Sequence, residues 1–219
     1  MADREALLSA LPAAELPQGS GSFHVNLSDP FPNQGCVIMA SGMGKRFGGN
    51  KLMAPFHGEP LIMRILRCTD GIFAHRVVVT RHQDVADLCR DAGIETVLHD
   101  LPYRSDTVRL GLEAVGEVES CMFCPADQPL LRPETIKSLC LCAADGKDLI
   151  WRTCYEDRVG APVIFPKWCF PELKALPEGK GGGILMQKYP EQVRTLPVRD
   201  MYELMDVDSP RDLAILQEQ

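Results

Sequence analysis

The sequence lacks the features that would place it in a membrane or in an oxidising compartment. No apolar run approaches the roughly 20 residues that a membrane-spanning helix needs. The N-terminal segment has acidic residues near its start instead of the basic-then-apolar order of a secretory signal. Nine cysteines, an odd number scattered through apolar segments, suit buried or free thiols better than a disulfide framework. We therefore expect a cytoplasmic protein with no membrane partner.

Positive charge is also scarce. The chain of 219 residues has 23 Lys and Arg against 30 Asp and Glu, a net charge of -7. Broad electrostatic binding to nucleic acid needs a basic face, so we expect a small ligand and no nucleic-acid partner. Residues 30–58 are an exception because they contain no Asp or Glu, which indicates that a negatively charged ligand binds there.

Two of the cysteines lie close together in "CMFC", as Cys121 and Cys124. The pair could serve redox chemistry or hold a metal. On a strand, however, residues three apart point to opposite faces and cannot chelate one ion. The pattern favours two separate core thiols.

Short apolar runs alternate with segments of helical spacing from residue 34 onward. We expect strands at 36–40, 76–80, 95–99 and 120–126, and helices near 60–69, 83–92, 105–115 and 133–143. This alternation predicts an α/β fold with a mostly parallel sheet covered by helices on both faces. Residues 1–33, with one short helix near 4–11, are expected to form an extension outside a single domain that spans 34–219.

The regular alternation of expected strands and helices ends after residue 151. A strand is expected at 160–165, a helix near 167–175, a glycine-rich break at 178–183 and a strand near 192–198. Ser209 and Pro210 can cap and begin a last helix.

The stretch "MASGMGKRFGGNKL", residues 39–52, places four glycines and three cations directly after the first expected strand. Ligands of open α/β sheets sit at the carboxyl ends of the strands, so a nucleotide would bind here. A phosphate-binding P-loop needs Ser or Thr after its Gly-Lys pair, and the Gly-Asn sequence at 49–50 does not fit. A dinucleotide fingerprint needs G-x-G-x-x-G, whereas the spacing here is G-x-G-x-x-x-G.

Glycines in this loop would let the backbone approach a polyphosphate closely, with its N–H groups turned inward. Lys45, Arg46 and Lys51 would supply positive charge to three phosphates. A solvated surface loop is the alternative reading of such a Gly-Lys run.

Carboxylates follow two other expected elements. Asp127, in "PADQPLL", comes directly after a buried strand, and Asp206 and Asp208, in "DVDSP", precede the last helix. Such side chains can hold a hard divalent cation through oxygen, as Mg²⁺ requires in phosphate chemistry. Each Asp is equally well explained as a helix N-cap.

Five motifs together resemble a known family. "MASGMGKRFGGNKL", "SDTVRLGL", "DQPLL", "GAPVIF" and "DVDSP" occur in the order found in the nucleotidyltransferases of the molybdenum cofactor cytidylyltransferase type, the MobA-like NTP transferases. The resemblance covers residues 36–217 and implies a Rossmann-like, three-layer nucleotidyltransferase fold. It also implies transfer of CMP from CTP to a phosphorylated acceptor, which is molybdopterin in this family, with release of pyrophosphate.

The resemblance also implies roles for individual residues. Its catalytic residues would be Arg46, Lys51 and Asp127; its nucleotide-binding residues Ala40, Ser41, Gly42, Gly44, Lys45, Thr107 and Gly111; and its Mg²⁺ ligands Asp127 and Asp208. A phosphate nucleophile is already mostly ionised at pH 7, so no dedicated base is needed. Catalysis would rest on positioning and charge neutralisation.

The chain departs from the family pattern at the base and acceptor sites. Ser41 stands where cytidylyl members have Ala and guanylyl members have Gly, and its side chain narrows the base site, which favours CTP over GTP. "YRSDTVRLGL" is closer to the isoprenoid-pathway cytidylyltransferases. Ala161 replaces a frequent His, and "EGKGGG" at 178–183 replaces G-D-x-G-A-R; these two departures bear on the acceptor and not on the nucleotide.

Two classes of function therefore remain. The first is an enzyme, either a molybdopterin cytidylyltransferase, a guanylyltransferase or a cytidylyltransferase for another small acceptor. The second is a non-catalytic nucleotide or cofactor carrier that assists a molybdoenzyme or its chaperone. Keeping Lys51, Asp127 and Asp208 favours the enzyme. The five histidines have no metal-ligand spacing and are expected to be bystanders.

Overall fold

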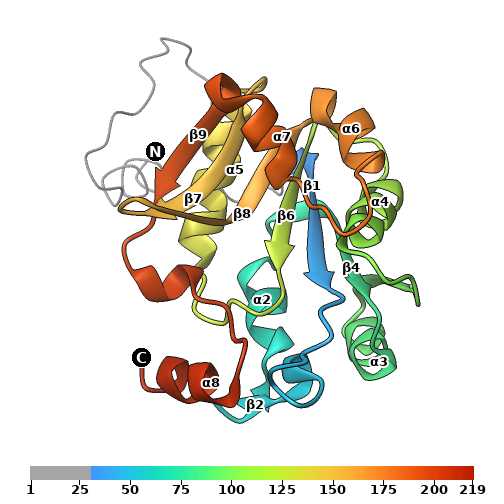
Figure 1. The fold of residues 1–219 in the computed structure, drawn as a ribbon, viewed down its shortest axis with the longest axis vertical. Coiled ribbons are helices and arrows are strands. Elements are labelled where there is room, and N and C mark those ends of the chain that lie inside the picture. The colour runs from blue at the N-terminus through green and yellow to red at the C-terminus, as the bar shows by residue number, and fades with distance from the viewer. Residues whose placement is uncertain (1–30) are drawn as a thin grey trace.

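The computed structural model describes residues 31–219 (Figure 1), so the helix expected near 4–11 lies outside the described residues. Seven strands form one sheet in the order β5-β4-β1-β6-β8-β7-β9. Their bounds are β1 Phe31–Ala40, β4 Phe73–Thr80, β5 Glu95–Leu98, β6 Ser120–Pro125, β7 Ile150–Tyr155, β8 Arg158–Pro166 and β9 Val193–Pro197. β8 runs antiparallel to both of its neighbours, and the other pairs are parallel. The expected mostly parallel sheet is confirmed.

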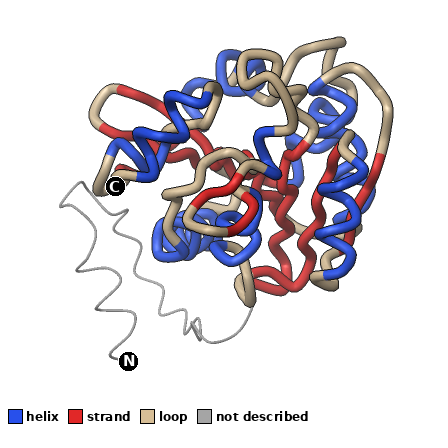
Figure 2. Tube along the Cα trace, turned by 90° about the horizontal axis from the view of Figure 1, so that it is seen from below, coloured by secondary structure: helices blue, strands red, loops and turns tan. Residues whose placement is uncertain are grey.

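Helices cover both faces of this sheet (Figure 2). The core on one face includes residues of α2 (Ile62–Cys68), α3 (Gln83–Asp91), α5 (Pro133–Asp145) and α8 (Pro210–Gln217). The core on the other face includes residues of α4 (Arg104–Val115), α6 (Phe170–Lys174) and α7 (Gly183–Lys188). Successive side chains of β1 point to opposite faces of the sheet, which explains why there are two core layers. Ile38 packs on the first face and Val37 on the second.

The two cysteines of "CMFC" follow the same rule. Cys121 belongs to the core on the α4 face and Cys124 to the core on the α2 face. All nine cysteines are buried and unpaired. Burial raises the pKa of both Cys121 and Cys124 well above the ordinary thiol value, which keeps them protonated and unreactive. The core-thiol interpretation therefore holds.

The structure differs from the expectations in three respects. β1 begins at Phe31, whose ring is buried in the core, so residues 31–33 belong to the sheet and not to the extension. The helix expected near 167–175 is divided into the 3-10 turn η2 (Lys167–Cys169) and α6. The short elements β2 (Pro55–Phe56), β3 (Glu59–Pro60), α7, η1 (Lys51–Met53), η3 (Pro190–Gln192) and η4 (Met201–Leu204) were not expected, because two to six residues are too few to show a hydrophobic period.

The strand order places a switch point between β1 and its neighbours β4 and β6. The chain passes from β1 to β4 on one side and returns to β6 on the other, so the loops that follow β1 and β6 diverge and leave room for a ligand. The arrowheads of β1 and β6 point toward the same edge of the sheet in Figure 1. Across residues 31–219, no helix combines the length and the apolar character needed to cross a bilayer.

Candidate active site

The glycine-rich loop leaves β1 after Ala40 and folds back on itself. Gly44 has a φ of +57°, and a Cβ there would lie 2.2 Å from the carbonyl oxygen of Gly49. The Gly44 carbonyl accepts hydrogen bonds from the backbone N–H groups of Phe47 and Gly48. Gly44 therefore closes the loop, whereas Gly48, with a φ of +83°, has open space where a Cβ would lie.

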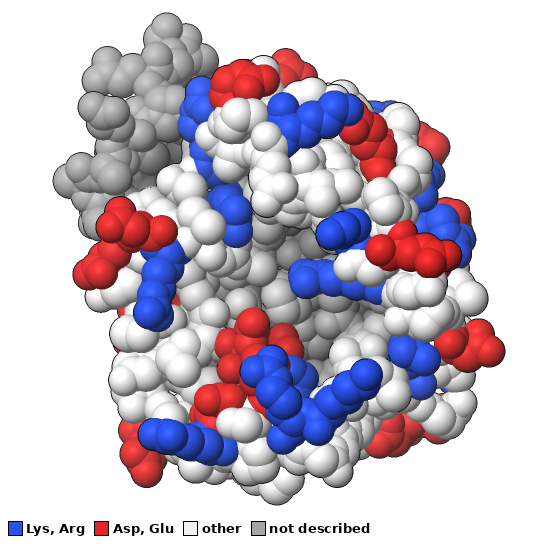
Figure 3. Space-filling view, viewed as in Figure 1, with Lys and Arg blue, Asp and Glu red and all other residues white. Residues whose placement is uncertain are grey.

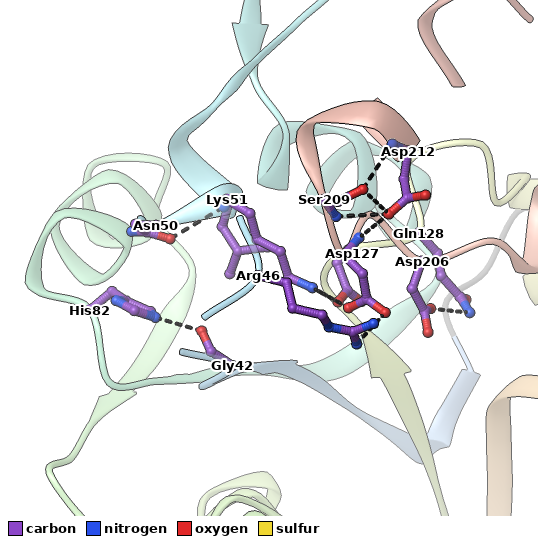
Figure 4. A network of polar contacts seen from close by, with 12 residues as sticks. Gly42, Arg46, Asn50, Lys51, His82, Asp127, Gln128, Asp206, Ser209 and Asp212 are labelled. Atoms are coloured by element: carbon purple, nitrogen blue, oxygen red, sulfur yellow. Dashed lines mark hydrogen bonds and ion pairs between the residues drawn. The ribbon is translucent and has the colours of Figure 1, made fainter. Parts of the chain in front are cut away.

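Lys51 is the buried centre of the polar network in Figure 4. It begins η1, which is capped by the side chain of Asn50, and its side chain is only 8% exposed. Its Nζ donates to Oδ2 of Asp127 at 2.5 Å and to Oδ1 of Asp208 at 3.4 Å. A buried ammonium is stable only when it is paired, so these two carboxylates compensate its charge.

Arg46 reaches one of these carboxylates, that of Asp208, from the loop. Its Nη2 donates to Oδ2 of Asp208 at 2.7 Å, while its own side chain is 75% exposed. One cation of this group is thus enclosed and the other is open to solvent. The open one can exchange a carboxylate for a ligand phosphate without exposing any buried surface.

The backbone brings the two aspartates together. The N–H of Val207 donates to the carbonyl of Asp127 at 2.9 Å, which fastens the segment before α8 to the end of β6. Ser209 caps α8, and the Asp212 carboxylate accepts from the backbone N–H groups of Asp208 and Ser209. The N-cap is therefore Ser209, as expected, and Asp208 is left available for its contacts with the cations.

A third carboxylate, Asp206, lies beside the pair. Its Oδ1 accepts from Nε2 of Gln128 at 3.0 Å. Although its side chain opens on the cleft, desolvation by the surrounding protein raises the pKa of Asp206, and the negative charge of Asp127 raises it further. Three carboxylates thus face two cations at this end of the cleft, an excess of acidic groups that favours a further cation.

A cleft of about 370 Å³ runs from these carboxylates toward α4. It is lined by Met39, Ser41, Gly42, Met43, Arg81, Pro102, Tyr103, Arg104, Thr107, Pro125, Asp127 and Asp206. Figure 3 shows a hollow in this face of the molecule, with Lys and Arg side chains around it and acidic side chains gathered at one end. Such an arrangement suits a ligand that carries several negative charges together with a cation.

Hydrogen bonds between strand ends form the wall of the cleft near Ser41. The Ser41 hydroxyl donates to the carbonyl of Val79 at 3.1 Å and lies 2.9 Å from Nε2 of His99. His82 contacts the carbonyl of Gly42 through its Nε2 at 2.8 Å. His82 and His99 thus contact residues that line the cleft, which the expectation of five bystander histidines did not foresee. Their sequence spacing gives no signal, because each contact joins residues at least 40 positions apart.

The remaining residues implied by the resemblance have different surroundings. Thr107 lines the cleft, but Gly111 does not. A Cβ at Gly111 would lie 2.4 Å from Cγ1 of Val37, so this glycine permits the close packing of α4 on β1. Ala40 is buried beneath the loop, and Lys45 is exposed on it. The implied nucleotide-pocket role of Gly111 is thus corrected to a packing role.

The glycine-rich break at 178–183 contacts two residues that line the cleft. Glu178 accepts a hydrogen bond from the Tyr103 hydroxyl, an interaction that raises the pKa of Tyr103. A Cβ at Gly181 would lie 3.2 Å from Nε of Arg104. The break therefore packs on Tyr103 and Arg104, two residues that line the cleft, and Lys180 is exposed on it.

The carboxylates meet one geometric condition for a divalent cation. Oxygens of Asp127 and Asp208 lie within 3.4 Å of one nitrogen, so a single cation can reach both, directly or through water. Within residues 31–219, no cluster of three or more His, Cys, Asp or Glu is arranged around a metal position. This composition fits Mg²⁺, which takes one or two protein carboxylates and completes its shell with water and substrate phosphates.

Comparisons with known proteins agree with this geometry. A family model described as the MobA-like NTP transferase domain matches residues 36–193. A 3-deoxy-manno-octulosonate cytidylyltransferase of Neisseria meningitidis is 34% identical over 92 residues, 39% of this chain and 36% of that protein. The bifunctional protein GlmU of Desulfitobacterium hafniense is 29% identical over 115 residues, 49% of this chain and 25% of that protein. The chain thus spans about a third or less of the length of these curated relatives.

Solved structures share the fold over most of the chain. Rv0371c of Mycobacterium tuberculosis has a TM-score of 0.73 and 25% identity, over 85% of this chain and 98% of that one. Its complex with manganese has a TM-score of 0.69 and 23% identity, over 85% and 99%. A CMP:2-keto-3-deoxy-manno-octonic acid synthetase complexed with CTP has a TM-score of 0.72 and 15% identity, over 85% and 97%.

Proposed function

The chain belongs to the MobA-like NTP transferase family, and from this we propose that it is an enzyme that transfers CMP from CTP to a phosphorylated acceptor of the molybdopterin type. The observation that carries the proposal is the convergence of Lys51 and Arg46 with Asp127 and Asp208 beside a glycine-rich loop. A carrier would not need a buried cation enclosed by two carboxylates at the place where phosphates bind.

In the proposed reaction, a terminal phosphate oxygen of the acceptor attacks the α-phosphorus of CTP. A bond from that oxygen to phosphorus forms, the bond from the α-phosphorus to the bridging oxygen breaks, and pyrophosphate leaves with the electron pair. The nucleophile is already mostly ionised near pH 7, since its second pKa is about 6. The protein therefore has to position the two phosphates and neutralise charge.

Lys51 and Arg46 supply that neutralisation. Both pair with carboxylates next to the glycine-rich loop, which is where the proposed triphosphate would bind. Binding of the triphosphate would transfer the contact of the exposed Arg46 from Asp208 to phosphate. The enclosed Lys51 would stay between the carboxylates and the leaving group. Lys45, exposed on the same loop, adds a third positive charge.

Asp127 and Asp208 are the residues that would hold Mg²⁺. When bound, the ion supplies a positive charge that polarises the phosphates and balances the leaving pyrophosphate. The protein contributes the fixed distance between the two carboxylates, set by the Val207 to Asp127 backbone hydrogen bond and by the capped start of α8. The known complex of Rv0371c with manganese supports use of a divalent metal.

The choice of CTP has separate support. The side chain of Ser41 lines the cleft and narrows it, which favours a pyrimidine over the larger guanine of GTP. A relative that is 34% identical over its matched segment is a cytidylyltransferase. That relative also raises a second candidate, a cytidylyltransferase whose acceptor is a small sugar acid. The two differ in chemistry, because a sugar hydroxyl has to lose a proton during attack and a phosphate does not.

The test is pyrophosphate release from CTP, GTP, ATP and UTP, with molybdopterin, with 3-deoxy-manno-octulosonate or without an acceptor, in the presence of Mg²⁺. We expect release with CTP and molybdopterin. Release with the sugar acid alone would establish the second candidate. Nucleotide binding without release under any of these conditions would favour a carrier, which could then deliver the nucleotide or cofactor to a molybdoenzyme or its chaperone.

A further inference from the structure

The hydroxyl of Ser41 is held from two sides at the wall of the cleft. It donates to the carbonyl of Val79 at 3.1 Å and lies 2.9 Å from Nε2 of His99. A serine hydroxyl has one proton to donate and two lone pairs that accept. A carbonyl oxygen can only accept, so the single proton points to Val79. The contact with His99 then requires a proton on Nε2 of the ring.

His99 is fixed so that it can supply that proton. Its backbone N–H donates to the carbonyl of Thr80 at 3.0 Å, at the end of β4. Its Nδ1 is buried and has no hydrogen-bond partner among the described residues. The opposite tautomer would leave a buried N–H unpaired at Nδ1 and set two lone pairs against each other at the Ser41 contact. Burial, and then the charge of Arg81, lower the pKa of His99, which keeps the ring neutral near pH 7.

We propose that His99 is a positioning residue that fixes Ser41 as a hydrogen-bond acceptor toward the cleft, so that the base site selects cytosine by its amino group and rejects uracil. The inference rests on the proposed nucleotide site and adds a determinant of base choice to it. With one lone pair used by His99 and the proton used by Val79, Ser41 offers the ligand only its second lone pair. Cytosine has an N–H₂ donor where uracil has a carbonyl oxygen, which would face this lone pair without a proton between them.

Dissociation constants of CTP and UTP, measured calorimetrically in Mg²⁺ on the full chain, test the proposal. The wild type should bind CTP roughly 10- to 100-fold more tightly than UTP, because the uracil carbonyl oxygen would face the Ser41 oxygen with no proton to form a hydrogen bond. Ser41→Ala and His99→Phe should each bring this ratio close to one. His99→Gln should keep it, since the glutamine amide can present an N–H near the position of Nε2.

Two further variants separate a role in selectivity from a role in folding. The double variant Ser41→Ala with His99→Phe should match Ser41→Ala alone, because His99 acts through Ser41. His75→Phe is the matched control. His75 is an exposed histidine of β4, near the amino-terminal end of that strand and away from the cleft. The His75→Phe variant should leave the ratio of the CTP and UTP dissociation constants unchanged.

The outcomes distinguish this inference from the function on which it rests. Tight binding of CTP and UTP with equal affinity, or a ratio that survives in Ser41→Ala, overturns the inference and leaves the nucleotidyltransferase proposal standing. An equal loss of affinity for both nucleotides in His99→Phe reduces His99 to a structural role. Absence of binding of either nucleotide to the wild type overturns both proposals. Tighter binding of GTP than of CTP overturns the base assignment and this inference with it.

Discussion

Replacing Lys51 by Met tests the central pairing of the site. Methionine has a similar length and volume, so it fills the space of the lysine stem and removes only the ammonium. In the wild type that ammonium is enclosed and lies 2.5 Å from Asp127 and 3.4 Å from Asp208. Without the ammonium, the negative charges of these two carboxylates and of Asp206 lie close together with less positive charge to balance them. The change should therefore lower both stability and turnover.

The cost in stability follows from how far the partners are buried. Removing one member of a fully buried ion pair costs about 3–5 kcal/mol. The side chains of Asp127 and Asp208 are 21% and 41% exposed, so water solvates part of their uncompensated charge. We therefore expect Lys51→Met to lower the free energy of unfolding by about 1–3 kcal/mol. For a chain of this length, that corresponds to a fall in Tm of about 2–12 °C.

The cost in rate follows from the proposed role of Lys51 at the leaving pyrophosphate. Loss of one charge-stabilising donor typically removes about 10²- to 10³-fold from kcat. Mg²⁺ should raise the Tm of Lys51→Met more than that of the wild type, because the ion restores positive charge between the carboxylates of the folded state.

Differential scanning fluorimetry with and without Mg²⁺, together with pyrophosphate release, measures these effects. Lys45→Met is the control for stability, because it removes a charge from an exposed side chain of the same loop. Its Tm should stay within about 2 °C of the wild type, because exposed substitutions usually change stability by no more than about 0.5 kcal/mol. If Lys51→Met keeps the Tm and the turnover of the wild type, the pairing has no functional importance and the phosphate site lies elsewhere.

Three other predictions follow from the described contacts. Asp127→Asn and Asp208→Asn should each abolish nucleotidyl transfer while the far-ultraviolet circular dichroism spectrum stays native. The double variant should lose little more activity than either single variant, since both carboxylates would act on one cation. Additive losses of activity would show that the two residues have separate roles. Ser209→Ala removes the cap of α8 and should lower stability by about 1 kcal/mol, measured by urea unfolding, and should also weaken Mg²⁺-dependent activity by releasing Asp208. Hydrogen bonding to Lys188 lowers the pKa of Glu172, so its contribution to stability is present above the unfolded pKa near 4.5 and is lost as pH falls through the lower folded pKa. Glu172→Gln should therefore lower the Tm at pH 7, with a deficit that shrinks in acid; a constant deficit from pH 7 to pH 3 would contradict this.

The sequence by itself determined the layers of the fold and the elements that carry the site. Apolar runs such as 36–40 and 120–126 need no distant contact to be read as buried strands, because a parallel strand is covered on both faces. The residues that follow them, the glycine-rich loop and Asp127, are placed at the carboxyl edge by their position in the chain alone. Ser209 could likewise be assigned as a cap from its neighbours, since a cap bonds to a backbone only two or three residues away.

Only the tertiary structure decided which of these residues meet. The contacts of Lys51 with Asp127 and Asp208 span 76 and 157 positions, and that of His99 with Ser41 spans 58. Gly111 shows the same limit, because a glycine that opens a pocket and one that lets a helix approach a strand have the same pattern in the sequence. Hydrophobic periodicity reports which face of an element is buried, but it does not report the partner. Hydrogen bonds and ion pairs act over a few ångströms, so their partners are fixed only when the sheet order and the packing of the loops bring distant segments together.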